Sequence, residues 1–290
     1  MRSIAHHIPR KVNVETKQLI PLKIFQTWKS KELPEKMYEV VNKIVELNPE
    51  YDYYFFDDDD CRKYLQDNYS SEYLDAFDDL IPGAFKADFW RYAVIAKEGG
   101  VYIDVDFDCV KPLREILDSD DSLVLVKDRG IGCCTAIFQA FFAATPNHNA
   151  IKETLQLCLD NIKNKRMGKT CLDLTGPGMM GKAFNKYTYG KICDVELNTG
   201  TFVFNGEKYR ILIHSFDECT VVDKNNIILF KTKFAEYDQL RTDNYGILHQ
   251  QGRIFNSGTP STSNSKFGIS ALIIFIVLLI LLLIILSRKR

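Results

Sequence analysis

The chain has 290 residues, a length that allows one large domain or two small ones. Its composition is that of a globular protein, with 46% hydrophobic, 26% charged and 12% aromatic residues. The formal net charge of -1 gives no general basic field that would attract nucleic acid, so we expect no nucleic-acid partner. Partners have to be inferred from local features.

Predicted strands and helices alternate along the first half of the chain. Apolar residues at helical spacing, such as Met37, Val40 and Ile44, mark one helix, and Gly99-Gly100 ends another. In chain order we expect a strand over 22–28, a helix over 34–47, a strand over 51–56, a helix from 57, a helix over 84–98, strands over 101–107 and 123–127, helices over 147–161 and 177–185, and β-like runs over 210–214 and 226–230. This order predicts an α/β fold in which helices cover a parallel sheet, with ligands at the carboxyl ends of the strands.

An apolar segment near the C-terminus differs from the rest of the chain. Phe267–Leu286 has no charged residue, and about 20 such residues in a helix span a bilayer core of about 30 Å. We therefore predict a transmembrane helix over 267–286, preceded by a polar stalk over 256–266 and followed by a basic tail over 287–290.

The topology of this anchor follows from weaker signals. Residues 1–19 form an N-terminal extension without an apolar core of signal-peptide length. We expect a single-pass C-terminal membrane anchor with the catalytic domain facing the cytosol. The basic tail favours the opposite, lumenal orientation, which stays open.

The most informative stretch is the strand expected to end at Asp104-Val105-Asp106-Phe107-Asp108. Side chains alternate along a strand, so Asp104, Asp106 and Asp108 are predicted to share one face. Crowded carboxylates repel one another unless a cation lies among them, and oxygen ligands suit Mg²⁺ or Mn²⁺. We therefore predict a divalent metal site here.

Three other interpretations of this stretch remain. A strand can end in a solvated acidic turn without a metal. A calcium loop would place Glu115 at its twelfth position, but it would need glycine where Cys109 stands. A phosphatase-type aspartyl nucleophile would call for Thr or Val at Asp108.

The helix before this strand contains two charged residues among apolar ones. Phe85, Phe89 and Tyr92 make it apolar on most sides, so we expect it to be buried. Asp88 and Arg91 are spaced i,i+3 and therefore lie on one flank. Buried ions need a partner or a ligand. The pair is either a structural ion pair or a polar wall that holds a hydroxylated substrate beside the metal.

These residues resemble the signature of the DXD-containing glycosyltransferases of family 32. The resemblance lies in three ordered segments, FKADFWRY at 85–92, GGVYIDVD at 99–106 and KPL at 111–113. IPLKIFQTW at 20–28 also resembles the opening strand of that family, with Phe25 where His is more usual. The family includes initiating mannosyltransferases, inositolphosphoceramide mannosyltransferases and capsular polysaccharide glycosyltransferases. The resemblance extends over about residues 20–180.

The resemblance implies a single GT-A catalytic domain over residues 20–255 and a retaining transfer of a hexose. The donor would be a UDP- or GDP-sugar with Mn²⁺ or Mg²⁺, and the acceptor a hydroxyl on a glycan, glycolipid or glycoprotein. The implied site residues are, for catalysis, Asp88, Arg91 and Asp104; for the nucleotide-sugar, Gln26, Thr27, Trp28 and Asp104; and for the metal, Asp104 and Asp106. No nucleophile is evident for a double displacement, so we expect attack by the acceptor on the face that the diphosphate leaves.

Weaker signals complete the prediction. His249 is a candidate third metal ligand or a surface histidine, and His214 is a weaker candidate. The run 57–60 is interpreted as a helix N-terminus, and 175–177 as a helix start near the pocket. Two other functions stay open: a catalytically silent, membrane-anchored nucleotide- or carbohydrate-binding protein of the same fold, and a metal phosphohydrolase.

Overall fold

The structure, a computed structural model, describes residues 1–128, 135–215, 218–232 and 244–257. The chain divides into two compact units, Met1–Ser257 and Gly258–Arg290, and the description below concerns the first. The predicted membrane helix over 267–286 lies outside the described residues. None of the helices in the described ranges is both long and apolar enough to cross a bilayer.

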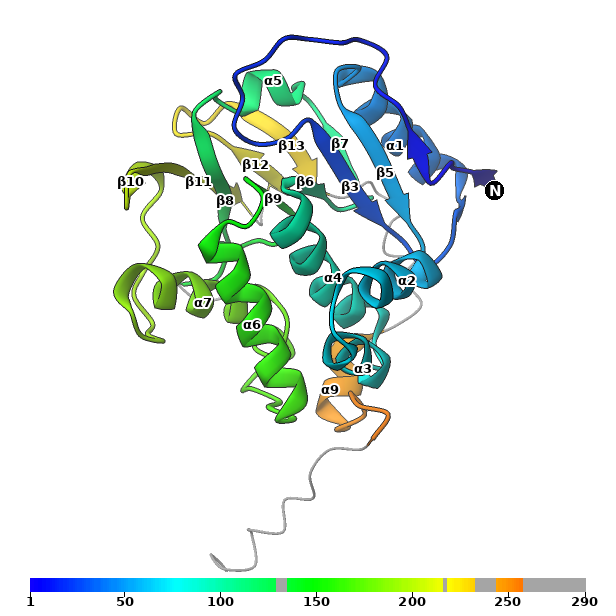
Figure 1. The fold of residues 1–290 in the computed structure, drawn as a ribbon, viewed down its shortest axis with the longest axis vertical. Helices are drawn as coiled ribbons and strands as arrows, with labels where there is room; N and C mark the ends of the chain where they lie inside the picture. The colour runs from blue at the N-terminus through cyan, green and yellow to red at the C-terminus, as the bar shows by residue number, and fades with distance from the viewer. Residues whose placement is uncertain (129–134, 216–217, 233–243, 258–290) are drawn as a thin grey trace, which may run out of the picture. The chain divides into compact units, whose positions relative to one another are not determined.

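A mixed sheet forms the centre of the first unit (Figure 1). Its strands lie in the order β2 (His7–Ile8), β5 (Asp52–Phe56), β3 (Lys23–Thr27), β6 (Gly100–Ile103), β9 (Phe141–Ala144), β8 (Asp121–Asp128), β11 (Glu207–Ser215), β12 (Thr220–Val222), β13 (Ile228–Thr232) and β7 (Phe107–Cys109). Strand β10 (Gly200–Phe204) pairs with β11, and β1 (Arg2–Ser3) pairs with β4 (Glu32–Leu33). Residues of the N-terminal extension thus add a strand to the edge of the sheet, where β2 pairs with β5.

The α/β class is confirmed, but the prediction of an all-parallel sheet is wrong. Strands β5, β3 and β6 are parallel to one another, and β8 is parallel to β11. Between these two groups, β9 runs antiparallel to both β6 and β8. The sequence analysis did not predict β9, a short buried run of apolar residues that has no alternation to mark it as a strand.

Helices cover both faces of the sheet and divide the core into two clusters. One face is covered by α1 (Glu35–Leu47) and α5 (Leu113–Ile116). The other face is covered by α2 (Asp58–Asn68), α3 (Ser71–Asp79), α4 (Gly83–Glu98), α6 (Asn149–Lys163) and α7 (Pro177–Tyr189). The short α9 (Tyr245–Gln250) packs Tyr245 and Leu248 against this second cluster. Helix α4 has buried residues on nearly every side, as its sequence predicts.

The strand expected over 101–107 is interrupted at the acidic motif. Strand β6 ends at Ile103, residues 104–106 turn, and β7 begins at Phe107. Because β7 pairs with β13 rather than continuing β6, Asp108 points elsewhere and forms an ion pair with Lys43 of α1. The prediction that Asp104, Asp106 and Asp108 share one face is therefore wrong.

Two glycines allow the abrupt connection from α4 to β6. Gly99 and Gly100 have φ values of +63° and +99°, which disfavour any residue with a side chain. A Cβ on Gly99 would lie 2.6 Å from the Pro146 nitrogen, and one on Gly100 would lie 2.7 Å from the Lys23 carbonyl oxygen. This close passage brings the charged flank of α4 beside the residues that follow β6.

Candidate active-site cleft

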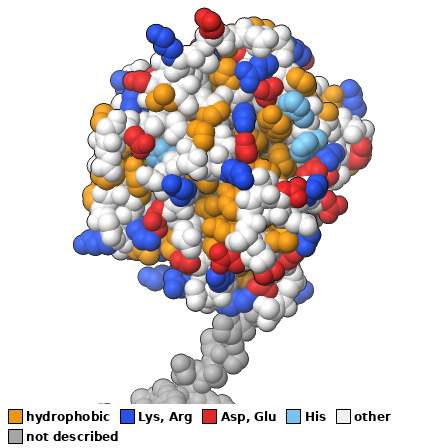
Figure 2. Space-filling model, viewed as in Figure 1, with side chains coloured by type: hydrophobic (Ala, Val, Ile, Leu, Met, Phe, Trp, Pro, Cys, Tyr) orange, Lys and Arg blue, Asp and Glu red, His pale blue; other side chains and the backbone are white. Residues whose placement is uncertain are grey.

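A cleft of about 570 Å³ lies at the carboxyl ends of β3, β6, β8 and β11. This is the edge at which ligands bind in open α/β sheets. Its polar and charged lining includes Thr27, Trp28, Asp58, Asp88, Arg91, Tyr102, Asp104, Asp106, Asp128, Gln139 and His214. On the face seen in Figure 2, positive and negative side chains are interspersed around apolar ones.

Arg91 joins the predicted catalytic residues into one network. Its Nη2 lies 3.4 Å from Asp88 Oδ1 and 3.3 Å from Asp104 Oδ1, and its Nη1 donates to the Gln139 carbonyl oxygen at 3.0 Å. The guanidinium carbon lies 4.4 Å from the centre of the Tyr102 ring. Burial alone would lower the pKa of Arg91, but the neighbouring Asp104 carboxylate raises it overall, so the guanidinium stays charged. The sequence-predicted proximity of Asp88 and Arg91 is thus found, and Asp104 joins them.

Asp88 is only 5% exposed, yet both of its carboxyl oxygens accept hydrogen bonds. Oδ1 accepts from the Gln139 side-chain amide, and Oδ2 accepts from the Thr175 hydroxyl at 2.7 Å. Burial raises the pKa of Asp88, while Arg91, Thr175 and Gln139 act against this rise. Thr175 lies just before α7, and Gly176 and Pro177 line the cleft. The predicted position of the 175–177 turn beside the pocket therefore agrees with the contact between Thr175 and Asp88.

Asp104 is held from two sides. Tyr102 donates its hydroxyl to Asp104 Oδ1 at 2.6 Å, and Gln26 donates its side-chain amide to the Asp104 carbonyl oxygen at 3.1 Å. Gln26 itself is fully buried and accepts from the Tyr53 hydroxyl at 2.7 Å, so it supports the acidic turn from behind. The structure does not bring Gln26 into the cleft, because its side chain leaves β3 on the face opposite to Thr27.

Thr27 and Trp28 line the cleft at the end of β3. The Thr27 hydroxyl lies 3.2 Å from the Cys61 sulfur, and Lys29 Nζ lies 5.7 Å from the centre of the Trp28 ring. An indole that lines a cleft offers a flat surface for a nucleotide base, and the contact of Trp28 with the base stays a prediction.

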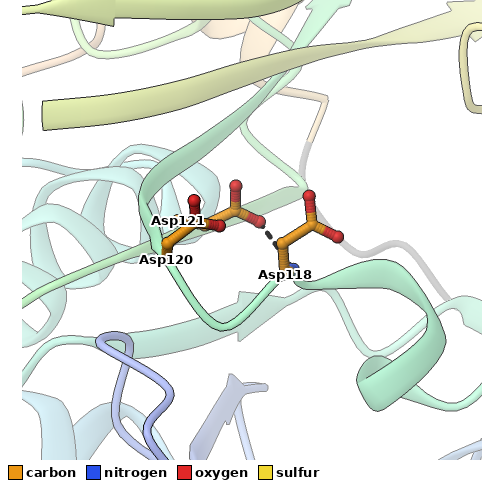
Figure 3. A group of neighbouring side chains, drawn as sticks. All are labelled: Asp118, Asp120 and Asp121. Carbon is orange, nitrogen blue, oxygen red and sulfur yellow. Dashed lines mark hydrogen bonds between the residues drawn. The ribbon is translucent and has the colours of Figure 1, made fainter.

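The donor set fits a hard divalent cation. Asp104 and Asp106 both line the cleft, and two carboxylates with open space beside them suit Mg²⁺ or Mn²⁺, which keep positions for phosphate oxygens and water. Within the described ranges, the group of three acidic side chains whose ligand atoms all lie within 4.8 Å of one another is elsewhere, at Asp118, Asp120 and Asp121 (Figure 3). Lys208 and Arg210 form ion pairs with that group, so protein cations offset most of its charge.

The predicted third ligand, His249, lies outside the residues that line the cleft. It is on α9, and its Nε2 is 2.8 Å from the Met167 carbonyl oxygen. Tyr245, one turn earlier on the same helix, does line the cleft. The role of His249 as a metal ligand stays a prediction.

The cleft residues Asp128 and Gln139 carry no prediction from the sequence, whereas His214 is its weaker histidine candidate. Asp128 and His214 face each other across the paired strands β8 and β11, with Nδ1 and Oδ1 3.1 Å apart. The His214 ring stacks on Phe138 at a centroid distance of 3.8 Å. Asp128 follows the strand predicted over 123–127, so the rule that ligands bind at strand ends could have found it. Gln139 had no sequence signal, since its place depends on β9.

Comparisons with known proteins agree with this site. Residues 34–123 match the family model described as a glycosyltransferase sugar-binding region containing DXD motif. The chain is 34% identical to inositol phosphoceramide mannosyltransferase 3 of Schizosaccharomyces pombe over 98 residues. This matched stretch covers 34% of this chain and 27% of that protein. The chain is also 30% identical to the initiation-specific alpha-1,6-mannosyltransferase of Candida albicans over 115 residues. This second match covers 38% of this chain and 30% of that protein.

A solved structure, the PaToxG glycosyltransferase, matches with a TM-score of 0.48 and 23% identity, covering 60% of this chain and 72% of that one. The two mannosyltransferases are matched over about a third of their length or less. The matched region contains Asp88, Arg91, Asp104 and Asp106, the residues on which the predicted resemblance depends. The resemblance is confirmed: residues 34–123 match the model of the sugar-binding region of DXD-containing glycosyltransferases.

Proposed function

We propose that this chain is a metal-dependent glycosyltransferase with a GT-A fold. It moves a hexose, in our proposal a mannosyl group, from a nucleotide-sugar to an acceptor hydroxyl. One observation carries the proposal: the ion-paired network of Asp88, Arg91 and Asp104 lines the same cleft as Asp106 and Trp28, within or beside the family match.

Each residue has a role in the proposal. Trp28 and Thr27 bind the nucleoside end of the donor, at the end of β3. Asp88 accepts hydrogen bonds from sugar hydroxyls, and Arg91 orients Asp88 and Asp104 toward the sugar. Gln26 is assigned a supporting role, since it holds the backbone of Asp104 from the core.

Asp106, with Asp104, would hold Mn²⁺ or Mg²⁺. When bound, the cation neutralises the charge that develops on the departing diphosphate. The chain itself supplies the carboxylate of Asp88 beside the sugar carbon, where positive charge develops in the transition state. Attack on the face that the diphosphate leaves, with retention of configuration, is part of the proposal.

The choice of mannose and of acceptor rests on what the relatives are called. Two of them are named as mannosyltransferases, one acting on inositol phosphoceramide. We propose GDP-mannose as the donor and a membrane glycolipid or glycan as the acceptor. The proposed C-terminal anchor at 267–286 would hold the cleft near a lipid acceptor, with the catalytic domain on the cytosolic side.

The test compares Asp106→Asn with Asp108→Asn in the full-length protein in detergent micelles. Both variants remove one carboxylate from the same acidic run, but Asp108 is paired with Lys43 outside the cleft. Each protein is incubated with Mn²⁺ and a panel of GDP- and UDP-sugars, and release of the nucleoside diphosphate is measured with and without inositol phosphoceramide. We expect Asp106→Asn to lose about 100-fold or more in turnover, and Asp108→Asn to stay within about twofold of the wild type.

Other outcomes would contradict parts of the proposal. Full turnover by Asp106→Asn would remove the metal assignment. Release of inorganic phosphate in place of a nucleoside diphosphate would indicate a phosphohydrolase. Metal-dependent binding of GDP or UDP without turnover of any sugar, with and without acceptor, would favour a binding protein.

A further inference from the structure

Gln139 connects three buried groups on the side of the cleft that Asp88 and Arg91 line. Its side-chain amide donates to Asp88 Oδ1, and its side-chain carbonyl accepts from the Tyr92 hydroxyl. Its main-chain carbonyl accepts from Arg91 at 3.0 Å. Gln139 is only 9% exposed, so these contacts are shielded from water.

The orientation of this amide is linked to the proton on Asp88. With Asp88 ionised, the NH₂ group must face the carboxylate, and the side-chain oxygen must face Tyr92. The Tyr92 hydroxyl then has two acceptors for one proton, Gln139 Oε1 and the Thr175 carbonyl oxygen, which lies 2.9 Å away.

With Asp88 protonated, the opposite orientation satisfies every group. The carboxyl group donates to the amide oxygen, the NH₂ group donates to the Tyr92 oxygen, and the Tyr92 hydroxyl donates to Thr175 alone. A flipped amide beside an ionised Asp88 would instead place two acceptors face to face. One proton therefore separates two hydrogen-bonded states of the same network.

The surroundings of Asp88 act on its protonation in opposite directions. Burial raises its pKa, whereas Arg91, Thr175 and Gln139 lower it and Asp104 raises it again. Tyr92 and Cys158 also face Asp88, and burial raises the pKa of both, so they stay neutral at ordinary pH. Among the groups around Asp88, Arg91 is the cation. The Gln139 amide and the Thr175 hydroxyl are neutral and donate hydrogen bonds directly to the Asp88 carboxylate.

We propose that Gln139 is a positioning residue that keeps Asp88 ionised, so that it can accept hydrogen bonds from the donor sugar, and that its amide flips when Asp88 gains a proton. This inference rests on the proposed function, since it assigns the sugar contact to Asp88. It adds a residue outside the acidic motif and the helix that carry the family resemblance.

The first test is the pH profile of kcat/KM for the donor in Gln139→Leu, with the full-length protein. Losing a hydrogen bond to a charged group should move the acidic limb of the profile upward by about one to two pH units. The deficit of the variant should therefore be large at low pH and shrink as pH rises. The matched control is Gln156→Leu, which removes the 3.0 Å amide contact with Asp160 on the surface of α6.

Thr175→Val is the second variant, in case Gln139→Leu fails to fold. Valine has the shape of threonine but cannot donate to Asp88 Oδ2, so the acidic limb should move in the same direction. The backbone carbonyl of Thr175, which serves Tyr92, is unchanged.

A readout without activity separates this inference from the proposed function. The free energy of unfolding is measured in urea from pH 4 to pH 8 for four proteins. They are the wild type, Gln139→Leu, Asp88→Asn, and the double variant that carries both substitutions. Because Gln139→Leu raises the folded pKa of Asp88, its extra cost in stability should grow as pH rises from the folded pKa of the wild type toward that of the variant. With Asp88→Asn, the effect of Gln139→Leu should not depend on pH.

In one contrary result, Gln139→Leu lowers kcat/KM equally at every pH; in another, its pH-dependent loss of unfolding free energy persists with Asp88→Asn. Either result would overturn the assignment of Gln139. A wild type that turns over no donor would instead overturn the proposed function, and the unfolding series would still decide on Gln139.

Discussion

Arg91 is a buried cation whose partners come from three parts of the chain. It is 6% exposed and lies between Asp88 on its own helix, Asp104 after β6 and the Gln139 backbone before β9. A guanidinium suits this place, because its planar set of donors can serve several acceptors at once, whereas the ammonium of lysine is a single point charge. Arg91 therefore fixes the mutual position of two carboxylates that would otherwise repel each other.

Replacing Arg91 tests this interpretation. Arg91→Met keeps an unbranched apolar stem and removes the charge, which leaves Asp88 and Asp104 without their shared cation. We expect a loss of about 3–5 kcal/mol in the free energy of unfolding at pH 7, measured by urea denaturation. Adding Asp88→Asn should recover part of that loss, since one uncompensated charge is then removed. A loss below about 1 kcal/mol would mean that water reaches the pair.

At this scale, the sequence was informative about residue types and less so about their directions. The i,i+3 spacing on a helix apolar on most sides brought Asp88 and Arg91 together correctly. The resemblance implies a donor contact for Gln26 as for Thr27, but neighbours on a strand point to opposite faces, and Gln26 lies outside the cleft lining. Asp108 was grouped with Asp104 by the same alternation, which fails where the chain turns.

Helix α6 begins with an unusual cap, His148. Its Nδ1 accepts from the Ala150 backbone amide at 3.2 Å, and its Nε2 lies 3.5 Å from Glu207. An imidazole can accept at Nδ1 only while that nitrogen is unprotonated. Burial lowers the pKa of His148, opposed by Glu207 and assisted by Lys152, so the folded protein favours the neutral ring.

The pH dependence of this cap follows from the sign of the shift. Because the folded pKa is below the usual value of about 6.5, the stabilisation is complete above 6.5 and is lost as pH falls through that value toward the folded pKa. His148→Asn offers a cap that does not titrate. We expect the wild type to lose about 1 kcal/mol more than the variant between pH 8 and pH 5, measured by urea unfolding. Parallel losses in the two proteins would contradict a titrating cap.

Elements with local signals were predicted well, and those that depend on distant partners were not. The run 57–60 forms the expected helix start: Asp57 accepts from the Asp60 amide, and Asp60 accepts in return from the Asp57 amide. Gly99-Gly100 ends α4 as expected. In contrast, β9 is short and uniformly apolar and pairs with β6, which lies far away in sequence, so local patterns gave no sign of it.

The described part of the whole molecule is one compact unit, and its proposed attachment to a membrane rests on the sequence of the second unit. Ile274→Arg with Val277→Arg would place two charges near the centre of the apolar segment, each costing about 2.5–3.5 kcal/mol in a bilayer. We expect the full chain to stay with membranes after carbonate extraction and the double variant to be released. Ser261→Arg with Ser263→Arg in the stalk is the control and should remain bound. Release of the unaltered chain would contradict the anchor.

The interruption between β6 and β7 also bears on how the protein is made. Asp104 and Asp106 lie between a strand held by β3 and β9 and a strand held by β13. The ribosome adds about 5–20 residues per second. The acidic turn is therefore synthesised several seconds before β13 (Ile228–Thr232), the strand that pairs with β7. During that interval β7 lacks its pairing strand, and the two carboxylates are tethered on one side only. Under the proposed function, the nascent chain should therefore acquire metal and nucleotide affinity only after β13 has been synthesised.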